Sequence, residues 1–239
     1  YSLELNITPN RSDATSHIGV ARDVVAYQRL KDEGAMLLFP QINSSKKENN
    51  LSIELVVENS NACPRYSGIV VSDLKVSPSP QWLQNKLLAI GLRPINNVVD
   101  VTNFVQFEYG HPLHAFDMAK IDGGKIVVKN VADKTPFKTL DEIERKLNAD
   151  DLMICSGSKP MCIAGIFGGI ESGVNESTKA VFIESAYFNP VSIRKTAKSH
   201  GLHTDASFRF ERGTDPNITI TAAQRAAELL VEICGGKIA

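Results

Sequence analysis

The stretch LMICSGSKPMCIAGIFGGIESGVNESTKAVFIES (residues 152–185) contains three short apolar runs with no helical pattern between them. The runs are Leu152–Cys155, Cys162–Phe167 and Ala180–Ser185, and glycine, serine and asparagine residues separate them. Apolar runs of this length between turn-forming residues are typical of β-strands. Strands that follow one another without regularly alternating helices indicate an α+β fold rather than a parallel βαβ fold.

The sequence on both sides adds further strands and a few helices. Strand-like runs are found at Leu3–Ile7, Ile53–Glu58, Arg65–Ser72, Val98–Val105 and Lys125–Asn130. Helix starts are indicated by Ser16, Ser79-Pro80 and Asn189-Pro190, and a last helix is predicted from Thr219 to Ile233. We therefore predict a layered, β-sandwich-like core with flanking helices, preceded by a small helical segment near Ser16–Leu30.

A polar run divides the chain into two unequal parts. The apolar pattern fades near Pro40, and the run NSSKKENN (residues 43–50) has the composition of a linker or exposed loop. We place a boundary there, between residues 1–40 and residues 41–239. The chain begins with Tyr1 rather than Met and enters a strand-like run at once, so we expect an excised fragment of a longer protein.

Composition excludes several classes of protein. Hydrophobic residues make up 43% of the chain and charged residues 22%, with a net charge of −1. A free-standing RNA-binding domain usually carries a basic excess, which this chain lacks. The four cysteines show no CxxC spacing, so we expect no metal site, and their scatter fits a reducing cytoplasm. No apolar run reaches the ~18–20 residues of a membrane span, so no membrane association is expected.

The stretch RPINNVVDVTNFVQFEYGHPLHAFD (residues 93–117) is the first candidate for a functional site because it is rich in polar side chains. These side chains could simply satisfy backbone groups at turns and strand ends. They could instead form the wall of a polar pocket, in which Arg93 would bind an anion and His114 would take part in hydrogen bonding or proton transfer. The residues themselves leave both interpretations open.

Three other features also allow two interpretations. The segment AGIFGGIESG (residues 164–173) lacks the GK[ST] of a P-loop, and it is either a tight turn or a place where the backbone approaches a ligand. Glu184 ends an apolar strand, where it either points to solvent or accepts a hydrogen bond from a ligand hydroxyl. A basic group forms either a solvated face or a contact for nucleic-acid phosphates; its members are Arg194, Lys195, Lys198, His200, Arg209 and Arg212.

Five strings in the chain resemble those of bacterial-type phenylalanine–tRNA ligase beta subunits, in the same order. They are ITPNRSD with GVARDVVA, RPINNVVDVTNFV, GHPLHAFD, AGIFGG and SIRKTAKSHGLHTDASFRFERG, and they cover nearly the whole chain. The resemblance implies that residues 1–40 are the C-terminal part of the subunit's first module. It also implies that residues 41–239 are the tRNA-editing domain, formed by the third and fourth modules.

The family's editing residues carry over to this sequence one at a time. The resemblance implies catalytic roles for His114 and Glu184, with Glu184 accepting a hydrogen bond from the hydroxyl of a tyrosyl group. One departure is His111, where the family frequently has glutamine. The implied substrate-binding residues are Arg93, Thr102, Asn103, Pro112, Ala164, Gly165, Thr204 and Ala206.

The resemblance also implies a biological setting. The whole enzyme attaches phenylalanine to tRNA(Phe) using ATP and magnesium, as a heterotetramer of two alpha and two beta subunits. This fragment would carry only the hydrolytic site for mischarged Tyr-tRNA(Phe) and would need no cofactor. An apolar synthetic pocket rejects an added hydroxyl only weakly, which is why a second site is useful. The alternatives are a non-catalytic scaffold that positions tRNA or subunits, and a free-standing aminoacyl-tRNA deacylase.

Overall fold

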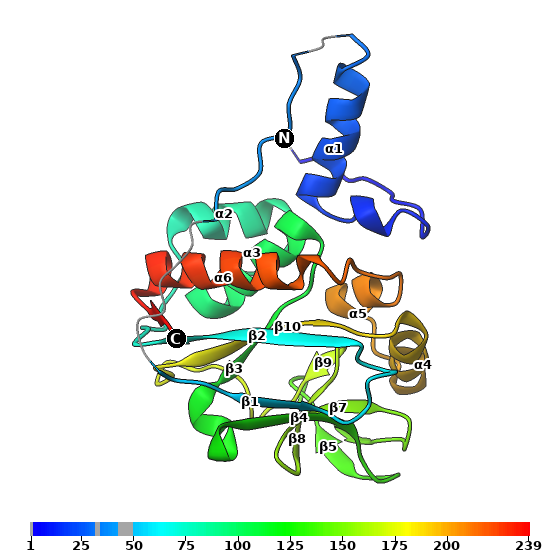
Figure 1. Cartoon of the computed structure of the whole chain (residues 1–239), viewed down its shortest axis with the longest axis vertical. Helices are drawn as coiled ribbons and strands as arrows, with labels where there is room; N and C mark the ends of the chain where they lie inside the picture. The colour runs from blue at the N-terminus through cyan, green and yellow to red at the C-terminus, as the bar shows by residue number, and fades with distance from the viewer. Residues whose placement is uncertain (1, 32–33, 43–49) are drawn as a thin grey trace.

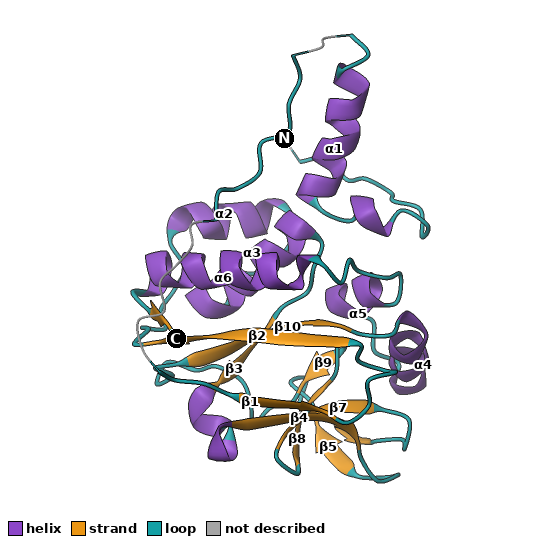
Figure 2. Ribbon diagram, viewed as in Figure 1, coloured by secondary structure: helices purple, strands orange, loops and turns teal. Residues whose placement is uncertain are grey.

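The computed structural model describes residues 2–31, 34–42 and 50–239. Three layers make up the main body: a layer of helices, a four-stranded sheet beneath it, and a five-stranded sheet beneath that (Figures 1 and 2). A smaller N-terminal part stands above the helical layer (Figure 1). The predicted α+β fold, with a layered sheet core and flanking helices, is therefore confirmed.

The five-stranded sheet is mixed. Its first two strands pair in parallel, and its other neighbours pair antiparallel, with an irregularity between Ile154 and Cys155. A separate two-stranded hairpin lies nearby, made of β5 (Pro136–Lys138) and β6 (Glu144–Lys146). In spatial order the five strands are β1 (Glu54–Val57), β4 (Lys125–Asn130), β7 (Leu152–Ser156), β8 (Lys159–Ile163) and β9 (Phe167–Gly168).

The four-stranded sheet is antiparallel and assembles strands from the whole length of the chain. Its central pair is β2 and β10, which run side by side over seven residue pairs. Because its two faces meet different layers, its strands are apolar on both sides. In spatial order the strands are β11 (Lys237–Ile238), β2 (Arg65–Ser72), β10 (Val181–Tyr187) and β3 (His114–Asp117).

Two hydrophobic cores fill the spaces between the three layers. One lies between the sheets and contains Phe116, Ile126, Ile154 and Phe182. The other lies between the four-stranded sheet and the helices α2 (Gln81–Ala89), α3 (Asn97–Tyr109) and α6 (Ile218–Cys234). The short helices α4 (Pro190–His200) and α5 (Asp205–Phe210) lie at one end of the sheets (Figure 2).

Side-chain caps fix where several helices begin. Asn189 accepts hydrogen bonds from the backbone amides of Val191 and Ser192 and so starts α4, as the Asn-Pro pair predicted. Ser16 accepts from the amide of Gly19 and starts α1 (His17–Gln28), also as predicted. Three short 3-10 helices complete the elements: η1 (Ser12–Ala14), η2 (Met118–Lys120) and η3 (Asp122–Gly124).

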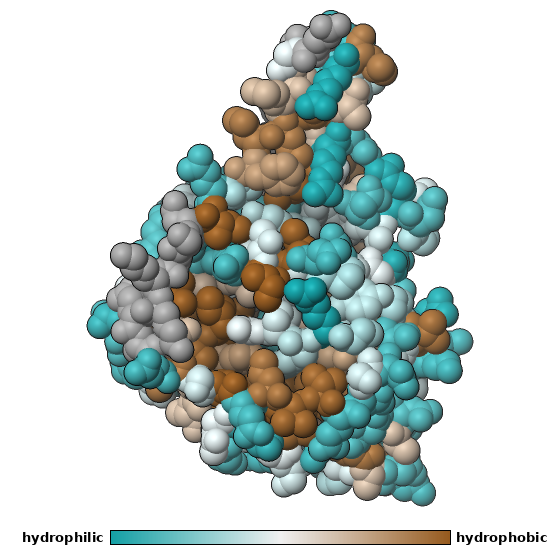
Figure 3. Space-filling model, in the orientation of Figure 1, coloured by the Kyte–Doolittle hydropathy of each residue, from teal (hydrophilic) through white to brown (hydrophobic). Residues whose placement is uncertain are grey.

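The N-terminal part buries little of its own apolar surface. It reaches the body where the ring Nδ1 of His17 lies 3.0 Å from the carbonyl oxygen of Phe107 on α3. Figure 3 shows the apolar surface on this part, at the top of the view. The predicted boundary at residues 43–50 falls almost entirely outside the described residues. The exposed apolar residues here are Leu3, Leu5, Val24, Tyr27, Leu30, Met36, Leu38 and Phe39.

Three sequence-based expectations about elements were wrong, and a fourth, the strand Cys162–Phe167, was right only in part. Residues 98–105 belong to helix α3, not to a strand, because Val98, Val101 and Val105 recur at helical spacing and are fully buried on one face. Residues 3–7 form no strand. Ser79 does not cap α2, because its hydroxyl donates to Asp100 instead and Pro80 takes the cap position.

The expected run Cys162–Phe167 is interrupted by a turn. Strand β8 ends at Ile163, and strand β9 begins at Phe167. Gly165 lies between them with a φ of 68°, a left-handed backbone that favours glycine. The turn lets the chain fold back so that β9 pairs antiparallel with β8.

Candidate functional site

Strand β10 places Glu184 in the interior. Successive side chains of a strand point to opposite faces, so Val181 and Ile183 pack under the helices while Phe182 and Ala186 enter the core between the sheets. Glu184 falls on the same face as Phe182 and Ala186, and it is only 5% exposed. A carboxyl group therefore lies on an otherwise apolar face of the central strand.

Glu184 and His114 are direct neighbours across two strands. In the register of β10 with β3, Glu184 pairs with His114, and in the register with β2 it pairs with Gly68. Directly paired residues on adjacent strands point to the same face, with Cβ atoms about 4.5–5.5 Å apart. The two residues predicted to act in catalysis are thus brought together from positions far apart in the sequence.

Burial controls the protonation of Glu184. Among the described residues no side chain or backbone group donates a hydrogen bond to its carboxyl group, and burial raises its pKa from 4.5 to about 8. Desolvation disfavours a charged carboxylate, so Glu184 is mostly protonated at neutral pH. A neutral carboxylic acid can both accept and donate a hydrogen bond, which suits it to recognise a hydroxyl group.

The His114 side chain is closely packed on the same face of the sheet as Glu184. Its Nε2 atom is buried without a hydrogen-bond partner, and its ring packs edge-on against Phe116 at 4.5 Å between centroids. Burial lowers its pKa from 6.5 to about 4, so the ring is neutral at physiological pH. A Cβ built on Gly168 would lie 3.1 Å from its Cε1 atom, so the glycine segment borders the ring.

Tyr66, which the sequence did not single out, lies on the same face of β2. It pairs with Ala186 and is the diagonal neighbour of Glu184, and its ring stacks on Phe182 with centroids 6.5 Å apart. Its hydroxyl is buried without a hydrogen-bond partner. Gly68 was the sequence signal that could have drawn attention to this part of β2, because a glycine inside a strand often marks a place where another group packs closely on the backbone. A Cβ on Gly68 would lie 2.2 Å from the Phe182 ring.

Two thiols lie in the same low-polarity region. Burial raises the pKa of Cys63 to about 12, and the negative charge of Glu184 raises it further. The same two causes raise the pKa of Cys162 well above its ordinary value. Both thiols are therefore protonated and unreactive, and they lie near enough to Glu184 for its charge to act on them.

The glycine segment is tied to helix α5. Thr204 caps α5 by accepting from the amide of Ser207, and its hydroxyl donates to the carbonyl oxygen of Ile166 at 3.0 Å. Ala164 is buried in the core between the sheets, and Ala206 packs against that core. Gly165 packs closely against aromatic and aliphatic side chains, so its missing Cβ serves core packing.

The remaining predicted residues lie in or beside the helical layer. Thr102 and Asn103 are on α3, where the hydroxyl of Thr102 donates to the carbonyl oxygen of Val99. Arg93 is exposed in the connection between α2 and α3, and Pro112 is buried just before β3. Among the described residues, no hydrogen bond or ring contact joins any of these four to Glu184.

His111 precedes strand β3 and, unlike most histidines in turns, is buried. Its side chain is completely buried, neither ring nitrogen has a hydrogen-bond partner, and the ring packs edge-on against Phe210. Burial lowers its pKa to about 4, so it is a neutral ring at physiological pH. It contributes no charge to the neighbouring strand β3.

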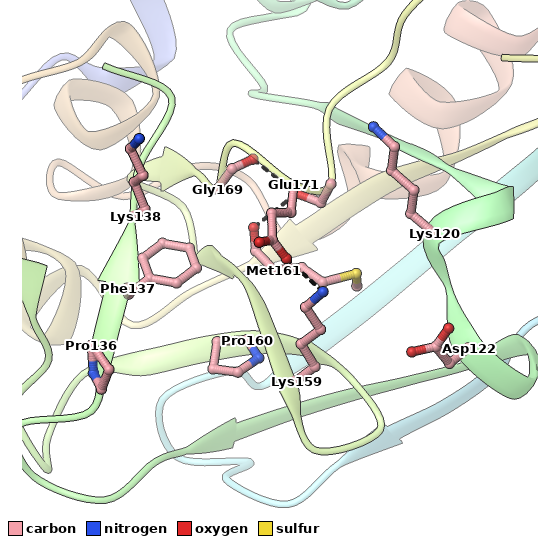
Figure 4. Close-up of a pocket in the computed structure, with 11 residues that line it drawn as sticks. Lys120, Asp122, Pro136, Phe137, Lys138, Lys159, Pro160, Met161, Gly169 and Glu171 are labelled. Atoms are coloured by element: carbon pink, nitrogen blue, oxygen red, sulfur yellow. Dashed lines mark hydrogen bonds and ion pairs between the residues drawn. The ribbon is translucent and has the colours of Figure 1, made fainter. Parts of the chain in front are cut away.

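Two clefts lie outside this group. A smaller one, of about 310 Å³, opens between the hairpin β5–β6, the β8–β9 region and η2 (Figure 4). Figure 4 shows Lys120, Lys138 and Lys159 around it, and the carboxylate of Glu171 binds Lys159 at 2.5 Å. Gly169 lines this cleft, whereas the preceding Gly168 faces His114, so the cleft and the Glu184 group lie on the two sides of one segment.

The larger cleft, of about 950 Å³, lies at the start of α4 and is lined mainly by amides and hydroxyls. At its edge Asp151 and His200 form a buried pair, with 2.6 Å between Oδ2 and Nε2. Glu184 and His114 line neither cleft. The closely packed group around Glu184 and His114 therefore lies outside both clefts.

The basic residues near α4 and α5 separate into two sets. Arg194, Lys195 and Lys198 are exposed along one face of α4, while the opposite face is buried. Arg209 is buried, with its guanidinium 4.4 Å from the centre of the Phe107 ring. Arg212 is bound to Glu211 at 2.7 Å. Only the first set is a free cationic surface.

Two further types of site are absent from the part of the chain that the structure describes. No cluster of three or more histidine, cysteine, aspartate or glutamate residues there could hold a metal ion. No helix there is long and apolar enough to cross a membrane.

Comparison with known proteins identifies relatives along the whole chain. The model of the B3/4 domain family matches residues 62–235. A phenylalanine–tRNA ligase beta subunit from Bacteroides fragilis is 56% identical over 239 residues, which is 100% of this chain and 29% of that protein. The beta subunit from Syntrophus aciditrophicus is 47% identical over 238 residues, again covering 29% of its length. The chain thus spans less than a third of these relatives.

A solved structure has a similar fold. It is an N-terminal fragment of the phenylalanyl-tRNA synthetase beta subunit from Pyrococcus horikoshii, with a TM-score of 0.53 and 18% sequence identity. The match covers 96% of this chain and 60% of that fragment. At this identity the likeness supports the fold alone.

Proposed function

The chain belongs to the B3/4 domain family and is homologous over its whole length to phenylalanine–tRNA ligase beta subunits, and on this premise we propose that it is the editing part of such a subunit. In this proposal it hydrolyses the ester of Tyr-tRNA(Phe), while the whole enzyme attaches phenylalanine to tRNA(Phe) with ATP and magnesium. The proposed partners are tRNA(Phe) and the alpha subunit, in a heterotetramer of two alpha and two beta subunits in the cytoplasm. The fragment itself would use no cofactor.

One observation carries the proposal. Glu184 is a buried, mostly protonated carboxyl group directly beside His114, with no hydrogen-bond donor from the described part of the chain. Burial of a polar group without a partner costs stability, so such a group is expected where a ligand supplies the missing bond. Tyrosine differs from phenylalanine by one hydroxyl, and a site that binds this hydroxyl in an apolar surrounding would discriminate strongly between the two.

The other residues receive the roles that the resemblance implies for them. Ala164 in the core between the sheets and Ala206 packed against that core are small residues that would leave room for the substrate ring. Arg93, Thr102 and Asn103 would position the tRNA 3′ end and the ester. Exposed cations on α4 would approach tRNA phosphates.

The attacking water needs a base, and His114 is poorly suited to that role. A pKa of about 4 makes its ring a weak base, although a neutral ring can still orient a substrate through hydrogen bonds. Hydrolysis in this proposal therefore depends on positioning of the ester and on groups of the tRNA itself.

The test is Glu184→Ala in the complete ligase. Hydrolysis of Tyr-tRNA(Phe) should fall by roughly tenfold to a hundredfold, because a hydrogen bond worth about 1–3 kcal/mol is lost. Charging with phenylalanine should stay nearly intact, since that reaction uses a different pocket. Glu184→Gln should be milder, because an amide resembles the neutral carboxylic acid in shape and in hydrogen bonding.

A matched control is Glu144→Ala on the exposed strand β6, which should change neither reaction. Unchanged Tyr-tRNA(Phe) hydrolysis in Glu184→Ala would contradict the proposal and favour a scaffold without catalysis. An equal loss of charging and hydrolysis would also contradict it, because the change would then act on the whole enzyme.

A further inference from the structure

Three polar groups without hydrogen-bond partners lie on one face of three adjacent strands. The hydroxyl of Tyr66 on β2 and the Nε2 atom of His114 on β3 are buried without a partner. Between them on β10 lies the carboxyl group of Glu184, which is 5% exposed and receives no hydrogen bond from the described residues. Most buried polar groups in proteins are paired, so each of these needs an explanation. Three such groups side by side point to a ligand that would pair with them.

The backbone register brings Tyr66 close to Glu184. Tyr66 pairs with Ala186, two residues along β10 from Glu184, and side chains at this diagonal spacing have Cβ atoms about 7–8 Å apart, within reach of an aromatic ring. Gly68, which pairs with Glu184, has no side chain. The Phe182 ring lies over Gly68 and stacks on the Tyr66 ring. The charge of Glu184 contributes to the raised pKa of Tyr66, after burial, which also indicates proximity.

The Tyr66 hydroxyl and the Glu184 carboxyl group can together satisfy the hydrogen bonds of a phenol hydroxyl. A phenol hydroxyl donates one hydrogen bond and accepts others through its oxygen. The carbonyl oxygen of the Glu184 carboxyl group can accept the first of these bonds. A hydrogen bond to the phenol oxygen needs a separate donor, and the Tyr66 hydroxyl is a donor without a partner.

We propose that Tyr66 is a specificity-determining residue that donates a hydrogen bond to the hydroxyl oxygen of a bound tyrosyl group, while Glu184 accepts from the same hydroxyl. This inference rests on the proposed function and adds a second reader of the hydroxyl. A phenylalanyl group would leave both Tyr66 and Glu184 unpaired, so each residue adds to the discrimination. His114 borders the opposite side of Glu184 and completes the polar group.

The test is Tyr66→Phe in the complete ligase, with deacylation of Tyr-tRNA(Phe) and Phe-tRNA(Phe) measured separately. Hydrolysis of the tyrosyl ester should fall about two- to tenfold, the range for one neutral hydrogen bond. Hydrolysis of the phenylalanyl ester and charging with phenylalanine should not change. Tyr187→Phe is the matched control, because Tyr187 is on the same strand as Glu184 but on the alternate face.

A second measurement separates recognition from a structural role. The Tyr66 hydroxyl is buried and unpaired, so its removal should leave the melting temperature of the 239-residue chain unchanged or raise it. A lowered melting temperature would show that the hydroxyl has a structural partner and would overturn the inference. Unchanged hydrolysis of the tyrosyl ester would overturn it as well.

Glu184→Ala, measured in parallel, distinguishes the two proposals. If Glu184→Ala loses editing and Tyr66→Phe does not, only the role of Tyr66 is refuted. If Glu184→Ala leaves editing unchanged, the proposed function fails, and the role of Tyr66 fails with it.

Discussion

Replacement of Glu184 by glutamine should remove a specific pH dependence from the stability of the chain. In the folded protein burial raises the pKa of Glu184 to about 8, whereas the ordinary value of 4.5 applies once the chain unfolds. Between these two values the folded chain holds a proton that the unfolded chain releases. The free energy of unfolding therefore falls as pH rises through this window, and this contribution is constant below about 4.5 and above about 8.

The magnitude follows from the two pKa values. Each pH unit within the window changes the stability by about 1.4 kcal/mol, so the full difference between 4.5 and about 8 amounts to about 5 kcal/mol. Between roughly pH 5.5 and pH 7.5 the wild-type chain should lose about 3 kcal/mol relative to Glu184→Gln. The glutamine does not titrate, and its amide occupies nearly the same volume as the carboxylic acid.

The assay is urea unfolding of both chains at several pH values, followed by circular dichroism, with linear extrapolation to water. The two buried histidines, His111 and His114, have pKa values lowered to about 4, so they make both chains more stable as pH rises from about 4 to 6.5. This effect cancels in the difference between the chains. A difference that stays constant with pH would refute the buried, protonated state of Glu184.

Three further outcomes test the packing around the site by the same denaturation assay. Gly165→Ala should cost about 1–3 kcal/mol, because its Cβ would lie 2.8 Å from Phe188 on a backbone with a φ of 68°; an unchanged midpoint would contradict this. Asn189→Ala should cost about 1 kcal/mol through loss of the α4 cap, and Asn189→Ser should restore most of it. Asp151→Ala should cost about 1–3 kcal/mol by leaving the buried His200 without its partner, and a cost near zero would show that water replaces the carboxylate.

Most strands of the sheets could be predicted from the sequence. Residues 65–72 and 125–130 form strands with the bounds that the sequence indicated, because each contains a short run of β-branched residues (Ile69–Val71 and Ile126–Val128) and follows turn-forming residues. Residues 98–105 have the same composition and form a helix. Asn96 caps that helix, and burial of three valines under α6 outweighs their preference for strands.

The candidate site could be predicted from the sequence only in part. The sequence marked Glu184 as an unusual carboxylate in an apolar strand, but the residues alone allowed it to point to solvent as easily as inward. Its position beside His114 depends on the pairing of β10 with β3, and pairing between distant strands is not encoded in local periodicity. Tyr66 was missed for the same reason, since its relation to Glu184 exists only through the register of β2.

The strand order of the four-stranded sheet has a consequence for synthesis of the protein. Strand β2 is made early, yet its two neighbours, β10 and β11, come from the last third of the chain. At roughly 5–20 residues per second, a ribosome leaves the edges of β2 unpaired for on the order of ten seconds. During this time an apolar strand, Arg65–Ser72, is open to wrong partners on the same or neighbouring chains. The group around Glu184 can form only after Tyr187 has emerged, so β2 and its side chains stay accessible to chaperones throughout this interval.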